Sequence, residues 1–496
     1  MRRLAALLSV LACVATAAAA IPAAAGAKPT SGPASPALGI KHVFVIVLEN
    51  ESYSASYETN PNPYLKTVLP SQGTLLTQYF GIGHESNPNY LAIVSGQTPN
   101  PMTQSDCQDY VDFEPAPAVF DPRGNGQAIG TGCVFPANVP TLADQLEAAH
   151  LTWHGYMEDM GNTVTREPAH CGAPTSSAGT GMRDGTQSAT ATDQYAARHN
   201  PFVYFHSVID SGSCHANVVP LYRLSTDLAA VDSTPNFSFI TPNLCNDGHD
   251  APCVGTDAKG SNAGGLTSID NFLSVWVPKI EASPAFQKDG LLIITTDEAA
   301  ASDAGACCGE QPGPNSPLPG VEGSGGGRTG SIVIGRCVPT GQQDATPYNH
   351  YSLLRSLEDL FGVRAGGSDG QGHLGYAGAS DLAAFGPDLF SITTTTMWSM
   401  PLDAGLGNEV GAVRRTARGA AVALLTTAPV AAAAPPTSSW RRVNGDMSGQ
   451  PFLAQEEKRS GPNAARSDAP AKPRCPLPSL PPAPSPYRSS RLRSSE

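Results

Sequence analysis

The sequence has little charge and few basic residues. Only 15% of its 496 residues are charged, whereas Gly and Pro number 50 and 45. This composition is typical of a loop-rich secreted globular protein and disfavours a coiled coil or an intracellular helical enzyme. Lys and Arg together number 30 against 43 Asp and Glu, which gives a formal net charge of −13. An acidic body repels phosphate backbones, so we expect no nucleic-acid partner.

Long hydrophobic runs are missing after the N-terminus. Residues 1–27 begin with Arg2 and Arg3, continue as an apolar Leu/Ala/Val run and finish in small residues, as a cleavable signal peptide does. A membrane anchor is the alternative, but the run is short and Ala-rich. No later stretch reaches the roughly 18 apolar residues needed to span a bilayer. We therefore expect a secreted or cell-surface protein.

Closely spaced cysteine pairs of the Cys-x2-Cys type are also missing, which argues against a zinc ribbon. Nine of the 11 cysteines lie between residues 107 and 337, and in an oxidising compartment they are expected to form disulfides. The adjacent Cys307 and Cys308 are not expected to bond to each other. Plausible pairs are Cys107 with Cys133 and Cys245 with Cys253.

Apolar β-branched runs alternate with helical patterns between residues 40 and 390. This alternation predicts one large α/β domain with a mostly parallel central sheet. Residues 28–39 read as a linker, and the Pro/Ser/Arg-rich residues 391–496 read as a disordered, low-complexity tail. The clearest expected strands are 43–48, 237–240, 291–294 and 331–334, and the clearest expected helices are 141–150, 268–280 and 350–361.

Acidic side chains follow two of the expected strands. Glu49 and Asn50 come after one buried strand, and Asp297 and Glu298 come after another. Open α/β sheets place ligand sites at the carboxyl ends of their strands. Three carboxylates and an amide meeting there favour a divalent metal, because the charges would otherwise repel. The alternative is that each acid caps the next helix or loop.

A second segment, Gly83 to Gly96, places a serine at the start of an expected helix. Pro88 suits the first turn of a helix that runs to about Ser95, so Ser86 lies at its N-terminal end. Free backbone N–H groups and the helix dipole favour a phosphoryl group there. An ordinary Ser or Asn cap is the alternative.

Five motifs in order resemble a bacterial phosphoesterase family that contains acid phosphatases and phospholipases C, within the alkaline-phosphatase-like superfamily. They are Val47-Leu-Glu-Asn50, Ser86-x-Pro-Asn-Tyr-Leu-Ala-x-x-Ser-Gly96, Pro242-Asn-x-Cys-x-Asp-Gly-His-Asp250, Thr296-Asp-Glu298 and His350-Tyr-Ser-Leu-Leu-Arg-Ser-Leu-Glu-Asp-Leu-Phe-Gly362. The resemblance covers roughly residues 40–390. It implies a three-layer α/β/α fold.

The resemblance also implies roles for particular residues. Ser86 would be the nucleophile, forming a phosphoserine, and His350 a leaving-group acid. Asn89, His249 and His154 would contact the phosphoryl group, although each histidine could equally be structural. The implied metal ligands are Glu49, Asn50, Asp297 and Glu298.

The implied metal is Ca²⁺, Mg²⁺, Mn²⁺ or Zn²⁺. The stretch with Asn243, Asp247 and His249 differs from the second metal site of two-zinc relatives, which leaves the number of ions open. Arg328 is a further possible phosphate contact.

The expected function is a secreted, metal-dependent acid phosphatase acting on small-molecule or lipid phosphate esters. Alternatives are a phospholipase C or other phosphodiesterase, which would meet a membrane surface, and an inactive cell-surface binding module on the same fold. A sulfatase is disfavoured because no Cys/Ser-x-Pro-x-Arg context occurs, and a serine hydrolase because Ser86 lacks a Gly-x-Ser-x-Gly elbow. The sequence does not indicate the oligomeric state.

Overall fold

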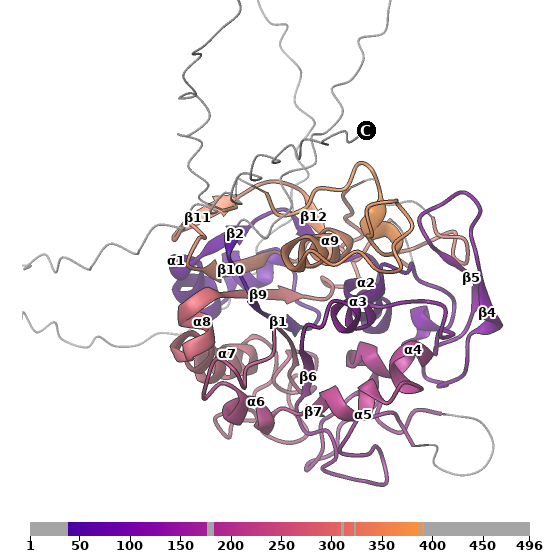
Figure 1. Cartoon of the computed structure of the whole chain (residues 1–496). Helices are drawn as coiled ribbons and strands as arrows, with labels where there is room; N and C mark the ends of the chain where they lie inside the picture. Colours follow the sequence, from indigo (N-terminus) through magenta and orange to yellow (C-terminus); the bar gives the residue numbers. More distant parts are fainter. Residues whose placement is uncertain (1–37, 176–182, 309–311, 322–323, 387–388, 391–496) are drawn as a thin grey trace, which may run out of the picture. The chain divides into compact units, whose positions relative to one another are not determined.

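The computed structural model describes residues 38–390 with gaps at 176–182, 309–311, 322–323 and 387–388 (Figure 1). All of these residues belong to one compact unit. The expected signal peptide (1–27), nearly all of the expected linker (28–39) and the expected tail (391–496) lie outside them. Among the described residues, no helix is both long enough and apolar enough to cross a membrane.

A mixed sheet of eight strands runs through the described residues in the order β11-β2-β10-β9-β1-β8-β6-β7 (Figure 1). The five strands β9, β1, β8, β6 and β7 are parallel to one another, and β10 is antiparallel to both β9 and β2. The expectation of an α/β fold with a mostly parallel sheet is confirmed. Its strands are β1 (His42–Leu48), β2 (Thr74–Leu76), β6 (Trp153–Met157), β7 (Val218–Pro220), β8 (Phe237–Thr241), β9 (Gly290–Thr296), β10 (Ser331–Gly335) and β11 (Gln342–Asp344).

The helices and smaller strand pairs surround this sheet. The pairs are β3 (Tyr79–Phe80) with β12 (Tyr348–Asn349), and β4 (Glu114–Phe120) with β5 (Ala128–Thr131). The helices are α1 (Leu69–Gln72), α2 (Ser86–Ser95), α3 (Leu142–Ala148), α4 (His206–Ile209), α5 (Ser213–Asn217), α6 (Tyr222–Asp227), α7 (Gly265–Ala282), α8 (Pro284–Asp289) and α9 (His350–Phe361). Shorter 3₁₀ or π turns lie at Ser54–Thr59, Tyr64–Val68, Thr103–Ser105, Ala197–His199, Pro201–Tyr204 and Gly375–Gly378.

Two apolar clusters, one on each face of the sheet, explain why β1 is continuously apolar over Val43–Leu48 and β9 over Leu291–Ile294. Val45 and Val47 of β1 belong to a cluster with residues of α2, α3 and α9. Phe44 and Ile46, which alternate with them, belong to a second cluster with residues of α6 and α7. Because successive side chains of a strand point to opposite faces, a strand covered on both sides must be apolar throughout. The three-layer arrangement follows from this burial (Figure 1).

The expected helices are present with their expected ends. Thr141 caps α3 in a capping box with Asp144, and Gly362, at a φ of +66°, ends α9. The seven expected strands and helices all match elements within three residues at each end.

Disulfides join Cys107 to Cys133 and Cys245 to Cys253, as expected, and also Cys171 to Cys214. The expectation for Cys307 and Cys308 is wrong, because these neighbours are bonded to each other. An extended backbone would turn adjacent side chains to opposite sides. The chain instead turns at Cys308, where φ is +65°.

Candidate active site

The ends of β1 and β9 bring together the first group of predicted site residues. These strands are parallel neighbours with Leu48 opposite Thr296, so Glu49 and Asp297 leave the sheet side by side. The backbone N–H of Asn50 donates to Asp297 Oδ1 over 3.1 Å. Glu49 and Asp297 therefore lie at the same edge of the sheet, as expected for the ends of parallel strands. Both residues are 0% exposed.

Ser86 reaches this group from the N-terminus of α2. Its Oγ donates to Glu49 Oε2 over 2.6 Å, and the Asn50 side-chain amide donates to the same oxygen over 3.2 Å. Ser86 is 2% exposed. The end of β1 and the start of α2, which the sequence analysis identified separately, thus meet in the folded chain.

Asn89 holds the turn that precedes Ser86. Its Oδ1 accepts from the backbone N–H groups of Ile82 and Gly83, and its Nδ2 donates to the carbonyls of Gly83 and Glu85. Both amide hydrogens are therefore used within the turn. Asn89 fixes the approach to α2 in this structure, and its expected contact with a phosphoryl oxygen stays a prediction.

A third strand end and a distant turn complete the group. The chain after β8 carries Asp247, and the 3₁₀ turn Ala197–His199 carries His199. Nε2 of His199 lies 3.3 Å from Glu49 Oε1, and its Nδ1 lies 3.2 Å from Asp247 Oδ2. The Tyr90 ring of α2 stacks on the imidazole at 5.1 Å between centroids. Glu49 thus faces Ser86 with one oxygen and His199 with the other.

These three side chains fit a metal ion. Ligand atoms of Glu49, His199 and Asp247 all lie within 4.8 Å of one another. Within the described residues, Glu49 Oε1, Asp247 Oδ2 and both His199 nitrogens are buried without hydrogen-bond geometry to any partner, as is Asp297 Oδ2. Buried polar atoms normally have partners. Two carboxylates and an imidazole with free lone pairs are a donor set that suits a divalent transition metal or zinc.

Burial and neighbouring charges shift the pKa values of all three side chains. Burial, followed by the neighbouring Asp297 carboxylate, raises the pKa of Glu49 well above its ordinary value. Burial, followed by Glu49, does the same to the pKa of Asp247. Burial lowers the pKa of His199, which keeps the imidazole neutral as a ligand must be. A bound cation would reverse the first two effects.

The predicted ligands Asn50 and Glu298 have other contacts. Asn50 turns its amide N–H groups to Glu49, and Glu298 Oε2 lies 2.5 Å from Nδ1 of His84. The other His84 nitrogen faces the Asp303 carbonyl at 3.0 Å. The candidate ligands in the structure are Glu49, His199 and Asp247, and of these only Glu49 was predicted. The predicted ligand Asp297 lies beside Glu49.

The three predicted histidines lie in different surroundings. Nε2 of His350 donates to the Asp297 carbonyl over 2.5 Å, and its Nδ1 lies 3.0 Å from the Tyr79 hydroxyl. Burial lowers the pKa of His350 to about 4, so it stays neutral. His249 borders the candidate metal-ligand group: its ring centroid is 6.3 Å from that of His199.

His154 and Arg328 are not brought to this group. His154 lies within β6, opposite Ser238 of β8, and contacts Asp227 and the Tyr156 hydroxyl. Arg328 lies over the Tyr53 ring, 3.9 Å from its centroid, and 3.7 Å from Glu58.

Sequence reasoning missed His199, Arg198 and His84. His199 sits in a short turn with no periodic pattern, and only its contact with Glu49, 150 positions earlier in the chain, marks it. Arg198 is 2% exposed, and its Nη2 donates to His249 Nε2 over 3.2 Å. His84 lies in the Gly83–Gly96 segment, but nothing in the sequence assigned it a role.

Comparisons with known proteins identify a family. The model of the Phosphoesterase family matches residues 54–364. A phosphate-repressible acid phosphatase of Penicillium chrysogenum is 27% identical over 301 residues, covering 60% of this chain and 53% of that protein. A phosphatidylinositol-3-phosphatase of Mycobacterium tuberculosis is 27% identical over 322 residues, covering 65% and 77%. The chain spans about half the length of the fungal acid phosphatases that it matches.

Among solved structures, a protein of the alkaline phosphatase superfamily from Vibrio parahaemolyticus has a TM-score of 0.37 and 15% identity, covering 68% of this chain and 71% of that one. A murine ectonucleotide pyrophosphatase/phosphodiesterase 5 has a TM-score of 0.36 and 11% identity, covering 66% and 96%. The family model, which matches more than half of the sequence, carries the assignment: the chain belongs to the Phosphoesterase family.

Proposed function

We propose that the chain is a metal-dependent phosphoesterase that hydrolyses phosphate monoesters, with Ser86 as its nucleophile. The observation that carries the proposal is the hydrogen bond from Ser86 Oγ to Glu49 Oε2, because the other oxygen of that carboxylate faces His199 and Asp247. A serine at a helix N-terminus, a base in contact with it and a candidate cation site beside it are the parts that phosphoryl transfer needs.

The proposed reaction has two steps. Glu49 accepts the Ser86 proton while Oγ attacks phosphorus. The ester oxygen leaves with the bonding pair and takes a proton from solvent, which gives a phosphoserine and the free alcohol. Water then attacks the phosphoserine and gives a proton to solvent, Ser86 Oγ leaves with the bonding pair and takes back the proton held by Glu49, and inorganic phosphate is released. The positive end of the α2 dipole would favour negative charge on the phosphoryl oxygens in both steps. In the first turn of α2, the Asn87 N–H already donates to Asp106 Oδ1 over 2.9 Å and Pro88 has no N–H.

The proposed cation is held by Glu49, His199 and Asp247, with Asp297 as a further candidate. When bound, it would supply Lewis-acid stabilisation of negative charge on the phosphoryl oxygens. Mn²⁺ and Zn²⁺ suit this mixed oxygen and nitrogen set better than Ca²⁺ does.

The remaining predicted residues take supporting roles. His350 fixes the Asp297 backbone, and Asn89 fixes the turn before Ser86. His249 is the better candidate for a substrate contact, because a third of its side chain is exposed beside His199.

Lipid and small-molecule esters are both proposed substrates, and the protein is proposed to be exported. The name of the mycobacterial relative supports a lipid phosphomonoester. The disulfides of the described residues support an oxidising compartment.

The test is hydrolysis of p-nitrophenyl phosphate by the Ser86→Ala variant, with Ser95→Ala as the matched control. Ser95 is buried at the other end of the same helix and bonds only within its own turn. We expect Ser86→Ala to lower kcat at least about 1,000-fold and Ser95→Ala to leave it nearly unchanged. EDTA should remove wild-type turnover, and Mn²⁺ or Zn²⁺ should restore it.

Parallel assays with bis-p-nitrophenyl phosphate and with phosphatidylinositol 3-phosphate separate the alternatives. Preference for the diester would replace the monoesterase proposal with a phosphodiesterase. Turnover by Ser86→Ala within tenfold of wild type would exclude Ser86 as the nucleophile.

A further inference from the structure

The loop that carries Asp247 is held by a glutamate that lies outside the candidate site. Glu158 follows the last residue of β6, and its backbone N–H donates to the Thr241 carbonyl at the end of β8 over 3.0 Å. Its side-chain Oε2 accepts from the Asn243 backbone N–H over 3.0 Å and from Asn246 Nδ2 over 2.9 Å. One carboxylate oxygen thus binds two points of the loop just before Asp247.

The hydrogen bonds continue from this anchor to the candidate ligands. Oδ1 of Asn243 accepts from the N–H groups of Cys245 and Asn246, and its carbonyl accepts from the N–H of Asp247 over 2.9 Å. The Asp247 carbonyl in turn accepts from the backbone N–H of Glu49 over 2.9 Å. The turn beginning at Asn243 therefore fixes the backbone positions of two of the three candidate ligands.

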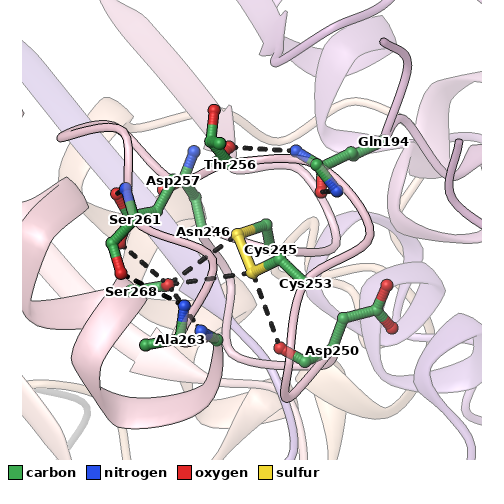
Figure 2. Close-up of a disulfide and its surroundings, with 12 residues drawn as sticks. Gln194, Cys245, Asn246, Asp250, Cys253, Thr256, Asp257, Ser261, Ala263 and Ser268 are labelled. Carbon is green, nitrogen blue, oxygen red and sulfur yellow. Dashed lines mark hydrogen bonds between the residues drawn. A yellow bond between two sulfur atoms is a disulfide. The ribbon is translucent and has the colours of Figure 1, made fainter. Parts of the chain in front are cut away.

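The far side of the same loop is closed by the Cys245–Cys253 disulfide (Figure 2). Oγ of Ser268 in α7 lies 3.7 Å and 3.8 Å from the two sulfur atoms. Asn246 is tied to the next stretch of chain, because its Oδ1 accepts from the Ala258 N–H over 2.9 Å. The loop is supported at both ends, and Glu158 supports the end that leads into Asp247.

We propose that Glu158 is a positioning residue: by fixing Asn243 and Asn246, it holds the Asp247 carboxylate against His199 and sets the affinity of the metal site without touching the ion. The inference rests on the proposed metal-dependent function. Residues behind metal ligands commonly change metal affinity about 10- to 100-fold when they are replaced.

The experiment measures Mn²⁺ and Zn²⁺ affinity of the metal-free full chain by competition with a chelator, together with the Tm. We expect Glu158→Ala to weaken metal binding at least tenfold and Glu158→Gln, which keeps an acceptor oxygen, to restore it to within about threefold of wild type. In p-nitrophenyl phosphate assays, saturating metal should return most of the kcat of Glu158→Ala.

Two further variants separate positioning from general destabilisation. Glu358→Ala removes another buried glutamate that accepts a backbone N–H, from Leu374 in a different region, and should lower the Tm without weakening metal binding. Asn246→Ala should weaken metal binding, and its effect should not add fully to that of Glu158→Ala, since both variants remove the hydrogen bond between Glu158 and Asn246.

Metal binding by Glu158→Ala within threefold of wild type would overturn the inference, as would equal weakening in Glu358→Ala. Those results would leave the proposed function intact. Wild-type protein that binds neither ion and has no turnover would overturn both.

Discussion

His199 shows at the scale of one residue how a functional side chain can lower stability. Its two nitrogens are buried among carboxylate oxygens without hydrogen-bond geometry, and its ring stacks on Tyr90. A buried polar group without a partner costs roughly 1–3 kcal/mol. Under the proposed metal role, an ion bound by Glu49, His199 and Asp247 would give the imidazole a stabilising partner.

His199→Phe should consequently separate folding from function. The phenyl ring keeps the stack on Tyr90 and removes both unpaired nitrogens, so the Tm of the metal-free protein should stay equal or rise. The increase in Tm that Mn²⁺ or Zn²⁺ gives the wild type should disappear, and kcat should fall at least about 100-fold. Calorimetry with and without metal checks the first two outcomes; a metal-dependent Tm increase that persists would contradict the ligand role.

Single residues also show where sequence reasoning succeeds. Glu49 and Asp297 were predictable because each follows a continuously apolar run, and parallel strands bring such ends to one edge. In the sequence, His154 and His199 are both isolated histidines. In the structure His154 lies inside β6, and its contacts are Asp227 and Tyr156. No local pattern distinguishes it from His199, because what matters is which distant residue each one meets.

At the scale of elements, two disulfides offer opposite tests. Cys245 and Cys253 are 8 residues apart beside Asp247, whereas Cys171 and Cys214 are 43 apart and outside the candidate site. The loop-entropy relation gives about 2.5 kcal/mol of stabilisation for the short loop and about 4 kcal/mol for the long one. Removing the long disulfide should therefore cost more stability, and removing the short disulfide should cost more activity.

We expect the Cys171→Ala/Cys214→Ala variant to lose more stability and the Cys245→Ala/Cys253→Ala variant to lose more metal affinity and turnover. Urea unfolding and chelator competition measure the two quantities. If both variants lose turnover only in proportion to lost stability, the short disulfide has no special relation to the site.

Helices and strands were the parts of the fold that the sequence predicted best. The strands at β1, β8, β9 and β10 and the helices α3, α7 and α9 were all readable, because burial imposes a period on them. The turns at Ala197–His199 and at Asn243–Asp247 have no period, since side-chain hydrogen bonds and a disulfide shape them. His199 lies on the first of these turns, which is why it was missed; Asp247 lies on the second, where the sequence left the number of ions open.

At the scale of the whole molecule, buried carboxyl groups make the metal-free protein more stable in acid. Burial raises the pKa of Glu51 to about 7, of Glu158 to about 7 and of Glu167, which also neighbours Asp193, to about 8. A carboxyl group whose folded pKa is raised contributes stability that is complete below its unfolded pKa of about 4.5 and is lost as the pH rises through its folded value. Stability should therefore fall between about pH 5 and pH 8.

Glu167→Gln tests this at a position outside the candidate site, where the side chain accepts the Gly161 N–H. The neutral amide cannot ionise, so the variant should gain Tm over wild type at pH 8, by roughly 2–4 °C, and gain little at pH 5. Thermal unfolding of metal-free protein at both values measures it. An equal change in Tm at the two pH values would show that ionisation of Glu167 is not responsible.

Because Glu49 contacts both Ser86 and His199, the proposed phosphoryl and metal positions should not be filled independently. A phosphate mimic that takes the Ser86 hydroxyl away from Glu49 frees that carboxylate to concentrate its charge on the other side. Thermodynamic reciprocity then requires that such an inhibitor tighten metal binding by the same factor by which metal tightens the inhibitor. Orthovanadate, measured with and without Mn²⁺, would give that coupling factor directly.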